Sequence, residues 1–467
     1  MSLSLPIQNR GFLSRFYRLA SVAILSNMMV PLAALFDAAF LGHLENINHL
    51  AGVILGGLLF DYLYRTLKFL RNSTNTLTAN ARGQDDPVAV LVALFRCGSI
   101  ALAITGGILL LQYPIHQLGF AMLSGSMDIE ASGLEYFNAR IWGAPAVLLN
   151  FVLFGWFLGR EMNGVIFLMS AIGNGTNVLF DYLAIVRWGW ESMGAGLATA
   201  LSQYLALLVG LVAMARSTQW TLFRKAWEQV KDRQGLRSAI ALKGNILVRF
   251  LVLISAYTIF TNLSASFGAE LLAENGLLLQ IALLSQFTVQ GVGMTSQTLI
   301  GNFKGQGRID RMLSVLQLAL VTALPIALAF ALGTILFPDT VFKLLTNHSD
   351  ISQAMRQYTL WLVPLLSLTA AVFMLESYFI GIKDGTTLRN GSVLGFTIGF
   401  LPLVLLAIHQ QSESILWSAL TSYMGVYLAF LTARLIRTHM QLSIVHRETE
   451  SNAMQIDGSP TTSTSPH

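Results

Sequence analysis

The sequence predicts an all-α integral membrane protein with twelve membrane-spanning helices in two lobes of six. Of the 467 residues, 54% are hydrophobic and only 11% are charged, whereas a soluble domain usually has about 25% charged residues. Apolar runs long enough to cross a bilayer recur along nearly the whole chain. Basic residues are concentrated in alternate loops. A β-barrel would instead show strictly alternating segments of about ten residues, and the sequence has none.

Twelve apolar runs define the predicted spans, with edges good to a few residues. They lie at about 16–41, 52–81, 88–112, 133–158, 162–187, 194–215, 238–261, 270–298, 312–337, 355–381, 387–408 and 413–437.

The loops after even-numbered spans carry the basic residues, most densely between residues 216 and 243. The loops 43–51, 262–269 and 409–412 contain no Lys or Arg. The positive-inside rule therefore puts both termini in the cytoplasm of a cell (inner) membrane protein. The net charge of +5 reflects this topology and does not indicate a nucleic-acid partner. We expect a monomer, and the single cysteine excludes a disulfide framework.

The long basic interruption near the midpoint divides the chain into two halves. We predict an N-terminal lobe (1–215), a cytoplasmic linker (216–237), a C-terminal lobe (238–437) and a disordered tail (438–467). A shift of 222 positions superimposes Thr76, Asn80 and Gly83 on Thr298, Asn302 and Gly305, and LGREMNG (158–164) on IGIKDGT (380–386). Because each half has an even number of spans, the repeats are parallel, as in transporters whose two lobes rock around a shared cleft.

The first span contains Pro31 and, six positions later, the carboxylate Asp37. A carboxylate inside a membrane costs several kcal/mol even on mild scales, so it indicates a functional site. Pro31 removes a backbone hydrogen bond, which predicts a kink or hinge beside Asp37.

The fifth span places Asn174, Asn177 and Asp181 on one helical face. The sixth adds the hydroxyl of Thr199. Together with Asp37 these side chains predict an oxygen-rich pocket that binds H⁺ or Na⁺. The alternative for Asp181 is a structural hydrogen bond to a neighbouring helix.

The second span carries a charged stripe, Asp61, Arg65 and Lys68, with Arg71 close to it. Such a stripe cannot face lipid. It predicts either a local Asp61–Arg65 ion pair between helices or the lining of a water-filled cleft that selects ligands. The two interpretations are compatible.

The second half has no equivalent pair of acids. Arg249 in the seventh span could form a structural ion pair with Glu274 or Glu376. No GxxxxGK[ST] phosphate loop occurs, which argues against an ATP-driven pump. No paired acidic motif indicates an enzyme, and no organic cofactor is expected.

The segments FDAAFLGHL (36–44), FLRNSTNTLTANARGQ (69–84) and GNGTNVLFDYLAIVRWGWESMGAGLATALSQ (173–203) resemble the multidrug and toxic compound extrusion (MATE) family, most nearly its DinF-type branch. The resemblance covers all twelve spans. It implies two six-helix lobes in a V and export of amphipathic compounds in exchange for H⁺ or Na⁺.

The same resemblance implies roles for individual residues. The family's coupling acid falls on Asp37, its span-five pair on Asn177 and Asp181, and its span-six threonine on Thr199. A family tyrosine and asparagine of the N-lobe pocket are similar to Tyr136 and Asn150. Where some members have a span-seven glutamate, this chain has Arg249, which favours coupling in the N-terminal lobe.

We therefore predict a secondary active antiporter for small amphipathic substrates. One alternative is a flippase for a lipid or lipid-linked precursor, whose phosphate the basic residues of the second span would attract. A membrane-embedded lipid enzyme and a non-transporting scaffold fit less well, since the first lacks paired acidic motifs and the second gives no reason for intramembrane acids.

Overall fold

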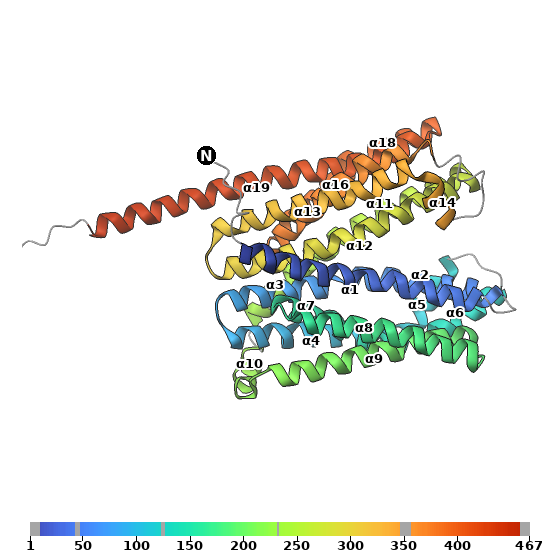
Figure 1. Cartoon of the computed structure of the whole chain (residues 1–467), viewed down its shortest axis with the longest axis horizontal. Coiled ribbons are helices and arrows are strands. Elements are labelled where there is room, and N and C mark those ends of the chain that lie inside the picture. Colours follow the sequence, from blue (N-terminus) through green and yellow to red (C-terminus); the bar gives the residue numbers. More distant parts are fainter. Residues whose placement is uncertain (1–9, 43–46, 123–126, 231–232, 346–355, 458–467) are drawn as a thin grey trace, which may run out of the picture.

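The computed structural model describes residues 10–42, 47–122, 127–230, 233–345 and 356–457, and all regular elements in these ranges are helices. The helices of the two halves lie on opposite sides of the long axis of the bundle (Figure 1). α1 lies between them and packs on α8 of the first half and α12 of the second.

In its described residues, the first half contains nine α-helices. They are α1 (Arg10–Gly42), α2 (Ile47–Leu67), α3 (Phe69–Gly83), α4 (Pro87–Leu110), α5 (Gln112–Met122), α6 (Met127–Arg140), α7 (Ala144–Gly159), α8 (Asn163–Asp181) and α9 (Glu191–Ser217). α2 and α3 form one span that is interrupted at Lys68. Short helical turns link α6 to α7 at η2 (Ile141–Gly143) and extend α8 at η3 (Tyr182–Arg187).

The second half follows η4 (Trp220–Leu222) and the short helix α10 (Phe223–Val230). Its helices are α11 (Arg233–Phe267), α12 (Ala269–Gly305), α13 (Ile309–Leu336), α14 (Pro338–Leu345), α16 (Leu362–Gly381), α17 (Gly385–Leu394), α18 (Leu401–Gln410) and α19 (Glu413–Asp457). η5 (Thr359–Trp361) precedes α16, and η6 (Gly395–Phe400) joins α17 to α18.

The predicted membrane architecture is confirmed. Ten helices in the described residues are long and apolar enough to cross a membrane. α1 and α8, which occupy the predicted first and fifth spans, are the other two long helices. The protein therefore has twelve spanning helices in two lobes of six.

The segment predicted as the linker contains the short helices η4 and α10. The aromatic face of α10 packs on α4: the rings of Phe223 and Trp227 lie 5.0 and 6.0 Å from that of Phe95. The tail predicted to be disordered continues α19 as helix to Asp457. No Gly or Pro interrupts residues 438–457, so nothing in the chain ends the helix there. Residues 458–467 lie outside the described ranges.

The two lobes approach most closely at one end of the bundle, which we call the terminal end. α1 begins there, and α3, α7 and α12 end there. A Cβ atom added to Gly83 would lie 2.0 Å from the carbonyl oxygen of Asn302, and one added to Gly305 would lie 2.2 Å from that of Asn80. Only glycine permits this backbone contact between α3 and α12.

Candidate functional site

A pocket of about 390 Å³ lies between the two lobes near the middle of the bundle. α2 lines it from the first lobe, and α11, α12 and α16 line it from the second. Its walls are Leu58, Asp61, Tyr62, Arg65, Lys68, Arg249, Phe250, Leu253, Ile254, Tyr257, Thr258, Thr261, Asn262, Leu279, Leu283, Gln286, Phe287, Gln290 and Phe373. Its size is within the range of small-molecule sites.

The charged stripe of the second span forms the first-lobe wall of this pocket. Arg65 Nη2 donates to Asp61 Oδ2 over 3.1 Å, in the predicted i,i+4 arrangement. Both side chains remain partly exposed. Lys68 lies at the break between α2 and α3, with its ammonium 5.3 Å from the centre of the Phe287 ring on α12. The stripe thus contains the local ion pair and also lines the cleft.

Arg71, predicted to lie close to this stripe, is not among the residues that line the pocket. Its guanidinium donates to Asn27 Oδ1 of α1 over 3.1 Å and contacts Met294 Sδ of α12. Arg71 therefore joins α3 to the two helices that face it.

Arg249 in the second-lobe wall forms a buried ion pair with a residue just behind that wall. The guanidinium of Arg249 on α11 donates a bidentate pair of hydrogen bonds to the carboxylate of Glu376 on α16. Both side chains are less than 10% exposed. The rings of Phe250 and Phe373 lie 4.6 and 5.6 Å from the guanidinium carbon. Glu274, the other predicted partner, lies near the first turn of α12 and Arg249 in the middle of α11.

The predicted coupling residues lie in the first lobe. Asp181 is fully buried, and Asn177 Nδ2 donates to its Oδ2 over 2.7 Å. Asn174 Nδ2 donates to the carbonyl of Ser170, and Thr199 Oγ1 to that of Ala195. Both of these bonds stay within their own helices.

Asp37 and Pro31 both lie in α1, which packs along α8. The side chain of Asp37 lies outside the described residues. Pro31 is half-buried and does not end the helix, which continues to Gly42.

Tyr136 and Asn150 are also buried in the first lobe. The Tyr136 hydroxyl accepts a hydrogen bond from Arg140 of the same helix. Asn150 Nδ2 on α7 donates to the carbonyl and side-chain oxygens of Gln203 on α9, over 2.9 and 3.2 Å. Gln203 and Arg140 are partners that the sequence analysis did not identify.

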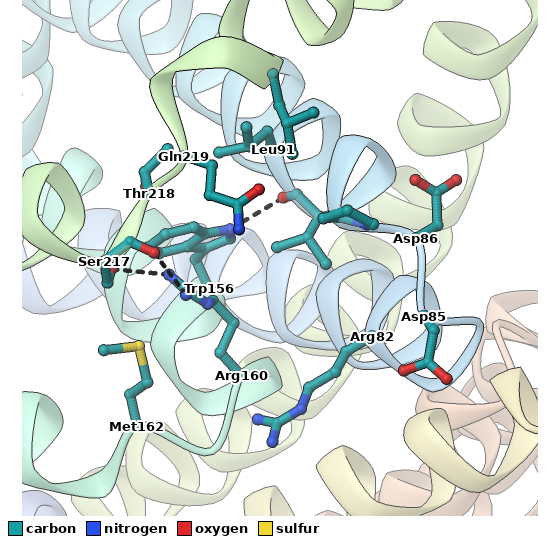
Figure 2. A pocket seen from close by; sticks show the side chains of 13 residues that line it. Arg82, Asp85, Asp86, Leu91, Trp156, Arg160, Met162, Ser217, Thr218 and Gln219 are labelled. Carbon is teal, nitrogen blue, oxygen red and sulfur yellow. Dashed lines mark hydrogen bonds between the residues drawn. The ribbon is translucent and has the colours of Figure 1, made fainter.

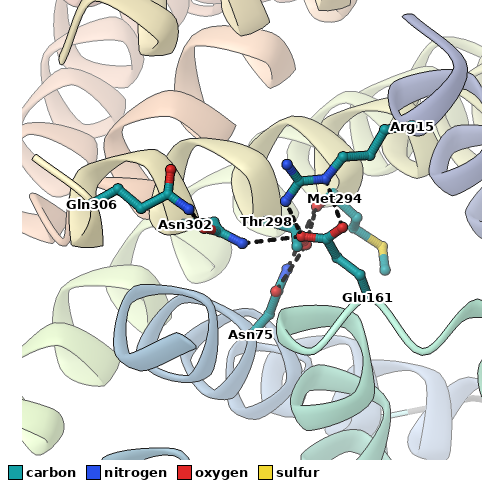
Figure 3. Close-up of polar contacts among 7 residues, drawn as sticks. All are labelled: Arg15, Asn75, Glu161, Met294, Thr298, Asn302 and Gln306. Carbon is teal, nitrogen blue, oxygen red and sulfur yellow. Dashed lines mark hydrogen bonds and ion pairs between the residues drawn. The ribbon is translucent and has the colours of Figure 1, made fainter. Parts of the chain in front are cut away.

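A network of polar contacts joins the lobes at the terminal end (Figure 3). In the turn after α7, the carboxylate of Glu161 accepts from Arg15 Nε over 2.8 Å and from Asn302 Nδ2 of α12 over 3.0 Å. Burial alone would raise the pKa of Glu161, but the hydrogen bond and charge of Arg15 lower it overall. Gln306 Nε2 in turn donates to Asn302 Oδ1 over 2.9 Å.

A second pocket, of about 490 Å³, lies in the first lobe at the terminal end (Figure 2). Arg160 stacks 4.3 Å above the ring of Trp156 and donates two hydrogen bonds to Ser217. Burial, followed by the charge of Arg82, lowers the pKa of Arg160. Asp85 and Asp86 also line this pocket, so its formal charges cancel.

Comparison with known proteins identifies relatives along almost the whole chain. The MatE family model matches residues 23–183 and 246–406. The chain is 30% identical over 418 residues to DNA damage-inducible protein F of Escherichia coli, covering 88% of this chain and 89% of that protein. It is 24% identical to a probable multidrug resistance protein NorM of Thermotoga maritima, covering 83% and 81%. A solved structure of a MOP superfamily transporter from Pyrococcus furiosus matches with a TM-score of 0.80 at 19% identity, covering 91% of this chain and 95% of that one.

Proposed function

The chain belongs to the MatE family of multi-pass efflux transporters, and we propose that it is a secondary active antiporter that exports amphipathic compounds in exchange for H⁺ or Na⁺. The observation that carries the proposal is the pocket between the lobes, whose walls come from both halves of the chain. A rocking motion of the lobes about this pocket would open it to each side of the membrane in turn.

The polar and apolar parts of the pocket suit an amphipathic substrate. Leu58, Leu253 and Leu283 offer apolar surface, and Gln286 and Gln290 offer amide groups for hydrogen bonding. Such a mixture of apolar walls and a few polar groups is typical of small-molecule sites.

Coupling would use the carboxylates of the first lobe. Asp181 is buried beside Asn177, and α1, which carries Asp37, packs along α8. A buried carboxylate is costly unless a proton or cation neutralises it. In the proposed cycle Asp37 and Asp181 take up H⁺ or Na⁺, and α1 bends at Pro31. The pocket between the lobes, which we call the transport pocket, then loses affinity for its substrate.

The orientation follows from the positive-inside rule, which would put the terminal end in the cytoplasm. The Gly83–Gly305 contact and the Glu161–Asn302 hydrogen bond would then close the pocket from the cytoplasm. In this proposal the structure is closed on its cytoplasmic side, and the substrate is released on the opposite side of the membrane. The protein acts as a monomer in the inner membrane.

Efflux from reconstituted vesicles tests the proposal. A fluorescent amphipathic dye is followed under an imposed pH gradient and, separately, under a Na⁺ gradient, for the wild type, Asp37→Asn and Asp128→Asn. Asp128 is an exposed carboxylate at the start of α6 and serves as the matched control. We expect one gradient to drive efflux in the wild type and the control but not in Asp37→Asn. Full coupled efflux in Asp37→Asn would refute the coupling mechanism.

A lipid or lipid-linked precursor flippase is the second candidate. The cations Arg65 and Lys68 in the pocket wall favour it, because they would attract a phosphate head group. A flippase would move a fluorescent phospholipid between leaflets without any ion gradient, and Arg65→Gln and Lys68→Gln would slow that movement.

A further inference from the structure

The charges of the transport pocket are unequal. Three cations and one carboxylate line it: Arg65, Lys68, Arg249 and Asp61. Asp61 is paired with Arg65, and Arg249 is paired with Glu376 just beyond the wall. Lys68 is left as the lining cation for which the described residues supply no ion pair.

The position of Lys68 suits a ligand contact. Its ammonium lies over the Phe287 ring of the facing lobe, an interaction that stabilises a cation without neutralising it. Arg65 and Arg71 are each three residues from Lys68 along the chain. Arg65 is paired with Asp61, and the described partners of Arg71, Asn27 and Met294, are neutral. The first-lobe wall therefore carries a net positive charge into the pocket.

The other residues that line the pocket are apolar, aromatic, or polar without a charge. Phe250, Phe287 and Phe373 provide aromatic surface. Tyr257 is held by a hydrogen bond of 2.8 Å from Gln286 Nε2 to its hydroxyl. This wall fits the apolar body of a ligand, and Lys68 fits one charged group on it.

On this basis, and resting on the proposed export function, we infer that the substrates are amphipathic organic anions whose negative group lies against Lys68. A hydrogen bond between an ammonium and an anion is about twice as strong as a neutral one, more so where water is excluded. A cationic substrate in the same place would put two like charges together, which selects against it. Lys68 is thus the residue that determines the charge of the substrate.

The experiment compares an aromatic anion with an aromatic cation. Binding of 8-anilinonaphthalene-1-sulfonate and of ethidium to the purified protein in detergent is measured by equilibrium dialysis for the wild type, Lys68→Gln, Lys68→Arg and Lys68→Glu. Arg224→Gln is the matched control, because Arg224 is exposed on α10 and does not line the pocket. Vesicle efflux of both dyes under pH and Na⁺ gradients is measured for the same set.

We expect the wild type to bind the sulfonate saturably, Lys68→Gln to bind it about tenfold to a hundredfold more weakly, and Lys68→Arg to retain most of the affinity. Lys68→Glu should bind ethidium in preference to the sulfonate. Arg224→Gln should behave as the wild type.

The two measurements separate the inference from the proposed function. Sulfonate binding that depends on Lys68, without efflux under either gradient, supports the anion site and refutes the antiporter. Gradient-driven ethidium efflux that Lys68→Gln leaves unchanged supports the antiporter and overturns the anion site. Equal sulfonate binding by the wild type and Lys68→Gln overturns it as well.

Discussion

Glu161 and Lys383 occupy equivalent positions in the two halves of the chain, 222 residues apart. Each contacts an asparagine of the opposite lobe. Glu161 accepts from Asn302, and Lys383 Nζ donates to Asn80 Oδ1 over 2.6 Å. Asn80 and Asn302 are themselves 222 residues apart. The internal repeat therefore produces two crossed contacts, one through an anion and one through a cation.

The local geometry of the two turns is the same. Both residues have positive φ, 58° for Glu161 and 65° for Lys383. Their backbone N–H groups donate to Leu158 and Ile380, again 222 residues apart, and both distances are 2.9 Å. The same exchange occurs one turn deeper, where Thr298 Oγ1 donates to Asn75 Oδ1 and Gln297 Nε2 donates to Thr76 Oγ1. We call the contacts of Glu161 and Lys383 with the opposite asparagines the crossed latch.

Removal of both charges from the crossed latch is expected to open the terminal end. In Glu161→Gln/Lys383→Gln the two charge-assisted hydrogen bonds are weakened. A charged hydrogen bond contributes about 1.5–3 kcal/mol, so the ratio of closed to open molecules should fall about tenfold or more. The measurement is the distance between spin labels at Gln84→Cys and Arg308→Cys in a Cys97→Ser background.

The two labelled positions are exposed and belong to different lobes. Arg224→Gln, again on the exposed face of α10, controls for loss of surface charge. An unchanged distance distribution in the double variant would mean that the crossed latch does not hold the lobes together.

Acid is expected to destabilise the fold through Glu161. The hydrogen bond and charge of Arg15, a residue of the same lobe, lower the pKa of Glu161 below the ordinary value of 4.5. In the unfolded chain the carboxylate would return to that ordinary value. The group therefore stabilises the fold above pH about 4.5, and this contribution is lost as the pH falls through the lowered pKa. Thermal unfolding in detergent should shift to lower temperature as the pH falls below about 4.5 in the wild type, and Glu161→Gln should show a flatter profile.

Gly83→Ala is expected to force the lobes apart without unfolding either of them. The added Cβ would lie 2.0 Å from the carbonyl oxygen of Asn302, which is backbone and cannot rotate away. Efflux should fall at least about tenfold while the protein still purifies as a folded species. Gly106→Ala on α4 is the control, since nothing lies within 4 Å of its added Cβ. Wild-type efflux in Gly83→Ala would show that the lobes need not meet at this point.

Hydropathy and the distribution of Lys and Arg among the loops were sufficient to predict the spans and the two lobes, because the bilayer imposes length and polarity on each helix separately. The partner of Arg249 could not be predicted in the same way. Glu274 and Glu376 both lie in apolar helices, and only the packing of α11 against the rest of the lobe selects Glu376.

The latch residues were missed for a different reason. Glu161 and Lys383 fall in predicted loops, where a charge is ordinarily solvated. The match of LGREMNG to IGIKDGT had placed them in register, and this signal could have singled them out. The sequence shows that Lys68 is unusual for a membrane span. Its position over Phe287 could not be predicted, because it depends on the contact between the lobes.

The buried pair of Arg249 and Glu376 leads to a prediction about stability. In Arg249→Met the carboxylate of Glu376, whose side chain is only 6% exposed, would lose its cation. Loss of one partner of a buried pair typically costs about 3–5 kcal/mol, whereas replacement of both by apolar residues is often neutral or stabilising. Thermal unfolding in detergent should therefore shift to clearly lower temperature in Arg249→Met and return toward the wild type in Arg249→Met/Glu376→Leu. If the single and double variants unfold at the same temperature, the cost of Arg249→Met comes from lost packing against Phe250 and Phe373 and not from the unpaired charge.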